Sequence, residues 1–263
     1  MTTSLTPQPA VNYPKRVRNE LRFRTLQVLS NQRIAGNFQR VVLGGADLAG
    51  FASSGFDDHI KLFFPQPGAS FAPPTLSEDG IVWPEGVRPQ ARDYTPMYDA
   101  LRNELTLDFY IHEAGVASDW ARNAQPGDSL TIGGPRGSLV VPENYHWQLY
   151  VCDETGMPAL LRRLAALSSL SQPVEVQAFI AVHDAASKSY FDHLNLRGVT
   201  LNWFVGEERA QIAERLQQLD VPDNDYFLWL TGEGETVLGY GSHFEKRHID
   251  AQLLRTVAYW HKK

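Results

Sequence analysis

Apolar and polar positions alternate in short runs through the first half of the chain. Residues 21–29 and 38–43 combine this alternation with β-forming side chains. Apolar residues at every second position place one side of a strand in a core. Further runs of strand type are residues 59–64, 105–111 and 129–133. Gly/Pro turns separate the runs, so the pattern predicts a small antiparallel β-barrel.

Continuous apolar runs replace the alternation after about residue 142. Strand-type runs of this kind are residues 148–152, 176–182, 201–205 and 226–230. Helical stretches, residues 159–170 and 211–219, lie between them. Strands that alternate with helices predict a parallel sheet with helices on both faces. We therefore predict two domains, a β-barrel over residues 1–142 and an α/β domain of nucleotide-binding type over residues 143–263, although the fold alone does not prove that function.

One long segment interrupts the predicted barrel. Residues 65–89 are rich in proline and carry no clear strand pattern. A loop of this length is uncommon in a compact domain and is more often functional than idle. We expect it to be a functional loop.

Charge and composition narrow the functional class. The formal net charge is −6, from 24 basic and 30 acidic residues. Nucleic acid is therefore not expected as a partner, because phosphate backbones need a basic surface. The single cysteine, Cys152, excludes an internal disulfide and a metal site built from several thiolates. The eight histidines show no paired ligand spacing, so we predict no bound metal.

The sequence also bears on location and assembly. No stretch is apolar and long enough to span a bilayer, and residues 1–10 lack the pattern of a secretory signal. We expect a cytoplasmic protein without membrane insertion. Nothing in the sequence suggests an obligate assembly, so we expect a monomer.

Two neighbouring segments combine an aromatic ring with a phosphate cradle. In residues 92–96, Tyr94 can stack on a flat ring, Thr95 can reach a ring nitrogen, and Arg92 can clamp a phosphate. Residues 112–120 follow, with small side chains that let a phosphate approach backbone amides, and Ser118 is a candidate N-cap of a helix. The alternative is an ordinary strand end followed by an ordinary capped helix. Together the segments favour a bound flavin dinucleotide.

Two loops of the second half are candidates for a nucleotide cleft. The apolar run 148–152 ends in residues 153–158, where Pro158 suits a first helical turn and Thr155 or Gly156 the cap. Residues 232–234 form a second small-residue loop after the last buried run. Open α/β sheets bind ligands at such strand ends, although the Gly-x-Gly-x-x-Gly fingerprint is absent. The alternative is two ordinary tight turns.

The combined motifs resemble the siderophore-interacting protein family, in particular its NADPH-dependent ferric-chelate reductases. The segments that carry the resemblance, in the family's order, are residues 92–96, 112–121, 126–128, 134–138, 153–159, 231–233 and 258–260. The resemblance implies a ferredoxin-reductase-like fold with FAD on the barrel. It implies FAD contacts from Arg92, Asp93, Tyr94, Thr95, His112, Val116, Ala117, Ser118 and Trp120. Many relatives carry Arg where this chain has Met97, which puts one phosphate contact in doubt.

The same resemblance assigns the second domain to NADPH. The implied contacts are Asp153, Thr155, Gly156, Met157, Gly232 and Glu233. No residue for the NADPH 2′-phosphate can be named from the sequence. Trp260, near the end of the chain, is expected to cover the flavin ring until nicotinamide displaces it, and Tyr259 is the less favoured cover. The alternative for Trp260 is a core-filling side chain.

Three basic residues are expected to hold the substrate. The resemblance matches Lys61, Arg136 and Arg255 to positions that present cations to an anionic ferric chelate, a catecholate siderophore above all. The alternative is three separate surface charges. Thr95 is expected to position the reactive edge of the flavin. The implied activity is FAD-dependent reduction of ferric siderophores or other ferric chelates by NADPH, with release of ferrous iron. Two alternatives are an NADPH-flavin reductase serving free flavin or a protein acceptor, and a siderophore carrier without activity.

Overall fold

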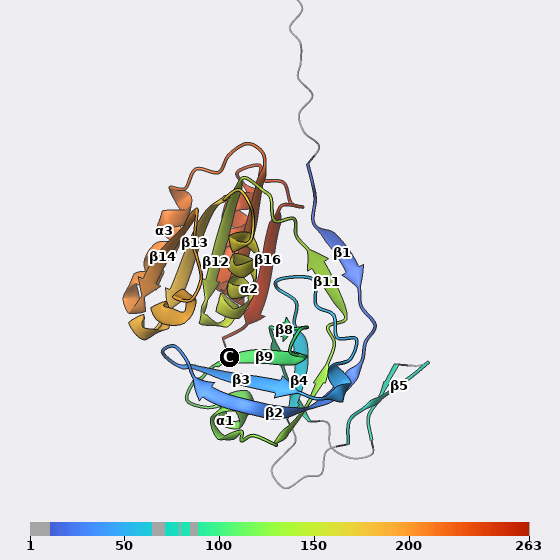
Figure 1. Cartoon of the computed structure of the whole chain (residues 1–263). Coiled ribbons are helices and arrows are strands. Elements are labelled where there is room, and N and C mark those ends of the chain that lie inside the picture. Colours follow the sequence, from blue (N-terminus) through green and yellow to red (C-terminus); the bar gives the residue numbers. More distant parts are fainter. Residues whose placement is uncertain (1–10, 65–71, 79, 85–88, 263) are drawn as a thin grey trace, which may run out of the picture.

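Two large sheets, one antiparallel and one parallel, dominate the described part of the molecule (Figure 1). The computed structural model describes residues 11–64, 72–78, 80–84 and 89–262. An antiparallel sheet forms the N-terminal domain and a parallel sheet forms the C-terminal domain. Both domains predicted from the hydrophobic pattern are thus confirmed as fold types. The predicted boundary near residue 142 lies between the last N-terminal strand and the first C-terminal one.

The N-terminal sheet has seven strands in an open, barrel-like arrangement. Their spatial order is β7 (Gln90–Tyr94), β4 (Ile60–Phe64), β10 (Ser129–Gly133), β2 (Phe23–Arg33), β3 (Phe38–Gly44), β9 (Glu104–Tyr110) and β8 (Met97–Asp99). The predicted alternation is visible in β2, where Leu26 and Val28 are buried and Gln27 between them is exposed. Because successive side chains point to opposite faces, one face of the sheet closes over an apolar core.

Smaller elements complete this domain. Strand β1 (Lys15–Arg18) pairs with β11 (Gly137–Val140), and β5 (Thr75–Ser77) pairs with β6 (Gly80–Val82). The short 3₁₀ helix η1 (Ala46–Leu48) follows β3, and α1 (Val116–Asn123) follows β9. The β5–β6 hairpin lies within the segment predicted as a loop, so that prediction was wrong there. Residues 65–71, 79 and 85–88 of the segment lie outside the described residues.

The C-terminal sheet has five parallel strands. Their spatial order is β14 (Val199–Val205), β13 (Glu175–Val182), β12 (Trp147–Asp153), β15 (Tyr226–Glu233) and β16 (Leu254–Trp260). The order reverses direction between β12 and β15, which makes the crevice at their carboxyl ends the switch point where such sheets bind ligands. Connecting segments are η2 (Glu154–Gly156), α2 (Met157–Ser168), η3 (Ala185–Phe191), η4 (Gly206–Gln211), α3 (Ile212–Gln217) and α4 (Gly234–Glu245).

The sequence pattern missed several elements of this domain. The helix predicted over 211–219 is shorter, because η4 forms its beginning and α3 ends at Gln217. Helix α4 and strand β16 were not predicted. Gly239 and Gly241 weaken the helix signal of α4, and β16 is only partly buried, so its side chains lack the continuous apolar run of a central strand.

A buried arginine holds the connection between the domains. Arg163 of α2 is 2% exposed and donates to the carbonyl oxygens of Val141 and Pro142. It also donates to the Tyr150 hydroxyl and to Gln148 Oε1, both on β12. A buried guanidinium with four hydrogen bonds fixes the groups around it. The start of the connection is thereby fastened to the parallel sheet.

The helices of the described residues are short. None of them has both the length and the apolar character that crossing a membrane requires.

Candidate functional site

The residues predicted to meet a flavin lie on the edge strand β7 and just beyond it. Tyr94 pairs with Ile60 and Arg92 with Leu62, so both project from the same face, as predicted. The Tyr94 ring packs on Phe109 with 4.4 Å between centroids, and burial raises the pKa of its hydroxyl. Thr95 is 6% exposed, whereas Arg92 is exposed and able to reach a ligand.

Helix α1 presents free amides beside this strand. Its N-cap is Gly115, at φ +150°, where an added Cβ would lie 2.8 Å from His112 Cε1. Ser118 was predicted as the cap, and this is wrong. It is the third helical residue, and its hydroxyl accepts a hydrogen bond from the His112 amide at 3.3 Å. The first-turn amides from Val116 onward have no partner within the helix, and they suit an anion.

Trp120 and Ala117 fix the position of α1 on the barrel. The Trp120 ring lies 5.7 Å from Phe109 and 5.8 Å from Phe64, and Ala117 is 5% exposed. Phe109 therefore contacts both Tyr94 and Trp120. Phe109 in the core thus fixes both the Tyr94 ring on β7 and, through Trp120, the helix α1.

A buried hydroxyl lies beside Thr95. Tyr259 of β16 has its ring near Trp229, and its hydroxyl has no hydrogen-bond partner among the described residues. Burial, with a smaller effect from the Asp57 charge, raises the pKa of Tyr259 well above its ordinary value, while the Arg255 charge and the nearby Thr95 hydroxyl lower it. An unpaired buried polar atom is costly unless a ligand meets it. The Tyr259 hydroxyl of the α/β domain therefore lies beside Thr95 of the barrel domain, at a place where a ligand could meet both.

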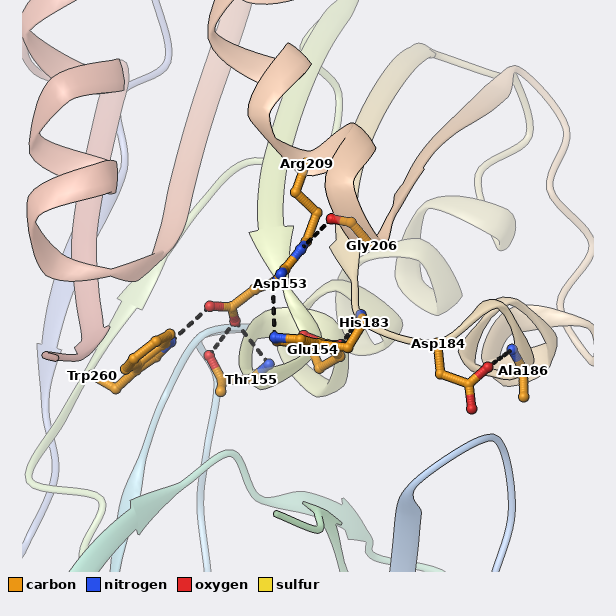
Figure 2. A network of polar contacts seen from close by, with 9 residues as sticks. All are labelled: Asp153, Glu154, Thr155, His183, Asp184, Ala186, Gly206, Arg209 and Trp260. Carbon is orange, nitrogen blue, oxygen red and sulfur yellow. Dashed lines mark hydrogen bonds and ion pairs between the residues drawn. The ribbon is translucent and has the colours of Figure 1, made fainter. Parts of the chain in front are cut away.

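The end of β12 carries the first of the two predicted nucleotide loops (Figure 2). Asp153 Oδ1 accepts the Thr155 amide at 2.9 Å and caps η2, while its Oδ2 accepts Trp260 Nε1 at 2.7 Å. Pro158 lies in the first turn of α2, as predicted, and Gly156 is the N-cap of that helix. Met157 is fully buried. Burial raises the pKa of the Asp153 carboxyl, against the hydrogen bonds from Thr155 and Trp260.

Gly232 and Glu233 lie directly across the switch point from Asp153. Gly232 has φ +140°, and a Cβ there would lie 2.9 Å from Asp153 Oδ2. Glu233 caps α4 by accepting the Thr236 amide at 3.1 Å. The hydrogen bond from that amide is the main cause that lowers the pKa of Glu233 to about 2. The structure thus brings both predicted nucleotide loops together at the carboxyl edge of the parallel sheet.

A further polar network follows the same edge. Glu154, buried in η2, faces His183 at the end of β13, and the His183 ring contacts Arg209 in η4 (Figure 2). The motif at residues 153–158 includes Glu154, but no sequence motif includes His183 or Arg209. They are isolated in sequence, and only the strand order brings them together.

The three predicted substrate cations come from neighbouring segments but differ in surroundings. Lys61 Nζ forms an exposed ion pair with Asp93 at 2.8 Å, on the face of β4 and β7 opposite to Tyr94. Arg136 is exposed and lies three residues after Gly133, which pairs with Lys61. The Asp93 side chain, predicted as a cofactor contact, is therefore engaged by Lys61.

Arg255 is tied to the barrel domain. Its Nε donates to Asp57, a carboxylate 3% exposed in the segment before β4, and Trp229 Nε1 donates to the same oxygen at 3.1 Å. The other Asp57 oxygen has no partner among the described residues. Asp57 was missed from the sequence, although two adjacent carboxylates followed by a histidine and an apolar run were a usable signal.

The arrangement fits a flavin dinucleotide and a nicotinamide dinucleotide. The α1 amides and exposed Arg92 suit a diphosphate, and the half-buried Tyr94 ring with the unpaired Tyr259 hydroxyl suits a flat ring with a polar edge. Trp260 lies against Asp153 and is 39% exposed, so its predicted cover of the ring stays a prediction. In the described residues, no three His, Cys, Asp or Glu side chains gather as metal ligands.

Family models match both halves of the chain. The model described as "Siderophore-interacting FAD-binding domain" matches residues 27–139, and the model described as "Siderophore-interacting protein" matches residues 145–263. Together they span the antiparallel sheet from β2 onward and the whole parallel sheet.

Curated relatives and solved structures agree with these models. The chain is 58% identical to the NADPH-dependent ferric-chelate reductase of Escherichia coli (strain K12), over 95% of this chain and 98% of that protein. It is 30% identical to the ferric vibriobactin reductase of Vibrio cholerae, over 90% of this chain and 89% of that protein. A siderophore utilization protein from T. fusca superimposes with a TM-score of 0.83 at 32% identity, covering 95% of this chain and 96% of that one. A ferredoxin-NADP+ reductase from Plasmodium falciparum shares the fold at 12% identity, with a TM-score of 0.64 over 89% of this chain and 95% of that one. The chain belongs to the siderophore-interacting protein family.

Proposed function

We propose that this protein is an FAD-dependent reductase that uses NADPH to reduce iron(III) in siderophores or other ferric chelates. The observation that carries the proposal is 58% identity, over nearly the whole of both chains, to a ferric-chelate reductase that depends on NADPH. The site supports it, because Thr95 of the flavin motif lies beside Tyr259, and the next residue, Trp260, bonds to Asp153 of a nucleotide loop.

The residues of this chain bind FAD and NADPH and orient them toward each other. When bound, the flavin supplies the chemistry that converts a two-electron donor into a source of single electrons for iron. Tyr94 offers a ring face, the α1 amides and Arg92 a diphosphate site, and Thr95 with Tyr259 polar contacts at a ring edge. Asp153 and Gly232 line the crevice for the nicotinamide nucleotide. No side chain is required as a nucleophile or general acid.

The substrate proposal rests on charge. We assign Lys61, Arg136 and Arg255 to the ferric chelate, with an anionic catecholate as the preferred class. The protein has a formal net charge of −6, so a multiply charged anion needs a local group of cations. Lys61 and Arg136 lie at the same end of adjacent strands, and Arg255 bonds to the segment that leads into β4. We further propose that the protein acts in the cytoplasm as a monomer.

Two alternative functions, a flavin or redox-protein reductase and a siderophore carrier, make different predictions that can be measured. A reductase of free flavin or of a redox protein shares the nucleotide sites but does not need three substrate cations. A carrier binds the chelate without oxidising NADPH, and the retained Tyr94, Thr95 and α1 arrangement argues against that role.

The decisive experiment is anaerobic NADPH oxidation against a panel of ferric catecholates, hydroxamates and citrate with an iron(II) trap present. We expect a yellow protein. Iron(II) should be released, and captured by the trap, fastest when the substrate is a ferric catecholate. A colourless protein that cannot be reconstituted with FAD, or faster turnover with free flavin than with every chelate, contradicts the proposal.

The substrate cations are tested with Lys61→Ala. Removing one charged contact should raise KM for a ferric catecholate roughly tenfold while flavin content stays unchanged. Lys246→Ala, which removes an exposed lysine at the end of α4, is the matched control. Equal loss of flavin and activity in Lys61→Ala would assign Lys61 to the fold instead.

A further inference from the structure

Three adjacent parallel strands each contribute one member of a chain of polar contacts. Glu154 follows β12, His183 follows β13 and Arg209 follows β14. Glu154 Oε1 lies 2.9 Å from His183 Nδ1 and also accepts the His183 amide. His183 Nε2 lies 2.7 Å from Arg209 Nη1. All three groups therefore lie at the carboxyl edge of the sheet, where the nucleotide crevice opens.

The partners determine the protonation of the imidazole. Arginine is always charged and only donates, so His183 Nε2 must accept from Arg209. The Nδ1 atom faces a carboxylate oxygen and must therefore carry the proton. His183 is thus neutral in this arrangement and connects a buried carboxylate to a guanidinium, with Glu154 3% exposed and the His183 side chain 55% exposed.

Arg209 is fixed on one side and open on the other. Its Nε donates to the Gly206 carbonyl at 2.7 Å, and Nη1 donates to His183. These contacts use two of the five N–H donors of a guanidinium. The others meet no acceptor in the described parts of the chain. A guanidinium held in this way presents a preformed fork, the geometry that suits a phosphate.

We propose that Arg209 binds the 2′-phosphate of NADPH and that His183 and Glu154 are positioning residues behind it. The inference rests on the proposed use of NADPH and names the group that selects it over NADH. In sheets of this strand order, an arginine near the second strand end accommodates a 2′-phosphate, whereas a free carboxylate there binds the ribose hydroxyl.

Two of the three neighbouring carboxylates are engaged elsewhere. Asp184 follows His183 directly, but its Oδ1 caps η3 by accepting the Ala186 amide at 2.9 Å, and Figure 2 shows it turned away from Arg209. Glu208 accepts the Val205 amide at 3.1 Å. Glu207 is exposed beside them. The guanidinium of Arg209, by contrast, is oriented by two hydrogen bonds at the sheet edge.

Binding of two adenosine nucleotides to the FAD-loaded protein tests the assignment directly. We expect adenosine 2′,5′-bisphosphate to bind more tightly than adenosine 5′-monophosphate, measured by titration calorimetry. Arg209→Ala should weaken the bisphosphate by roughly 10- to 100-fold, the range for a charged hydrogen bond, and leave the monophosphate within about twofold. Arg197→Ala, which removes an exposed arginine at the amino end of β14, should change neither.

Positioning is tested with His183→Asn. This variant keeps a donor for Glu154 but has no acceptor that reaches Arg209. KM for NADPH should rise several-fold while KM for NADH and kcat with either donor stay constant. Arg209→Lys keeps the charge without the fork and should lose most of the preference, which guards against an unfolded Arg209→Ala.

The outcomes distinguish this inference from the proposed function. A wild-type protein that binds both nucleotides equally, or an Arg209→Ala protein that keeps the bisphosphate preference, overturns the inference even if ferric chelates are reduced. Loss of the preference in Arg209→Ala supports it even in a protein that reduces no ferric chelate. A fall in kcat with NADH in His183→Asn assigns His183 to general support of the fold and overturns its positioning role.

Discussion

The Tyr259 hydroxyl shows how much one atom can indicate about a site. It lies beside Thr95, is buried, and meets no partner among the described residues. Folding around such a group costs free energy unless something in the working protein satisfies it. The adjacent Trp260 bonds to Asp153 instead, so the two terminal aromatics face different halves of the site. Tyr259, the less favoured ring cover from sequence, is the aromatic beside Thr95.

We predict that Tyr259→Phe separates these possibilities. In FAD-free protein the change should raise the free energy of unfolding by about 1–2 kcal/mol, because an unpaired hydroxyl is removed. In FAD-bound protein the gain should vanish or reverse. Urea unfolding of both forms measures the difference. Tyr145→Phe is the control, because that hydroxyl bonds to the Asn12 carbonyl and its loss should destabilise both forms alike. An equal gain in both forms would show that the flavin does not meet Tyr259.

Elements were predictable from sequence where burial is regular. The central strands β12, β13 and β15 carry apolar runs because both faces are covered, and the turn at Pro158 has its own chemistry. The sequence pattern did not predict β16, because this strand is partly exposed, or α4, because this helix contains glycines. Within the site, motif residues such as Tyr94 could be predicted. Contacts made by strand order, such as Asp57 with Arg255 and His183 with Arg209, could not.

At the scale of a helix, the Glu233 cap of α4 gives a pH-dependent prediction. Hydrogen bonds hold its folded pKa at about 2, against an ordinary value of 4.5. A depressed carboxyl pKa stabilises the folded state above pH 4.5, and the contribution is lost as pH falls from 4.5 through 2. Glu233→Gln should therefore have a lower urea midpoint than wild type at pH 7, and the gap should close below pH 3.

The matched control for this pH dependence is Glu235→Gln. It removes the same charge from the first turn of α4, and Glu235 is exposed. Its urea midpoint should follow wild type closely at both pH values. A gap for Glu233→Gln that is constant from pH 7 to pH 3 would show that ionisation of the Glu233 carboxyl does not contribute to stability.

Across the whole molecule, a few buried polar contacts join the domains. Asp108 of β9 is bonded by Arg40 of β3 and by Tyr190 of η3, which reaches over from the α/β domain. Asp57 is bonded by Arg255 and Trp229 from the same domain. These contacts anchor the α/β domain to the barrel at two places. Arg255 therefore has a structural role in addition to the proposed contact with substrate.

We predict strong coupling between Asp57 and Arg255. Arg255→Ala leaves a buried carboxylate without its charge partner and should lower the free energy of unfolding by about 3–5 kcal/mol. Adding Asp57→Asn should recover part of that loss, since the stranded charge is removed. Urea unfolding of the two single variants and the double variant measures the coupling. Additive losses would mean that the two side chains do not interact, and substrate effects of Arg255 are best measured in the double variant.

The bonded start of the interdomain connection limits how the enzyme can move. A swinging hinge needs backbone that rotates freely, yet the carbonyls of Val141 and Pro142 are held by a guanidinium that is itself enclosed. A rotation of the backbone at these residues would break the hydrogen bonds between Arg163 and both carbonyls, and it would leave buried polar groups without partners. Rotation of one domain against the other about Val141 and Pro142 is therefore disfavoured, and a hinge motion during turnover needs backbone outside these two residues.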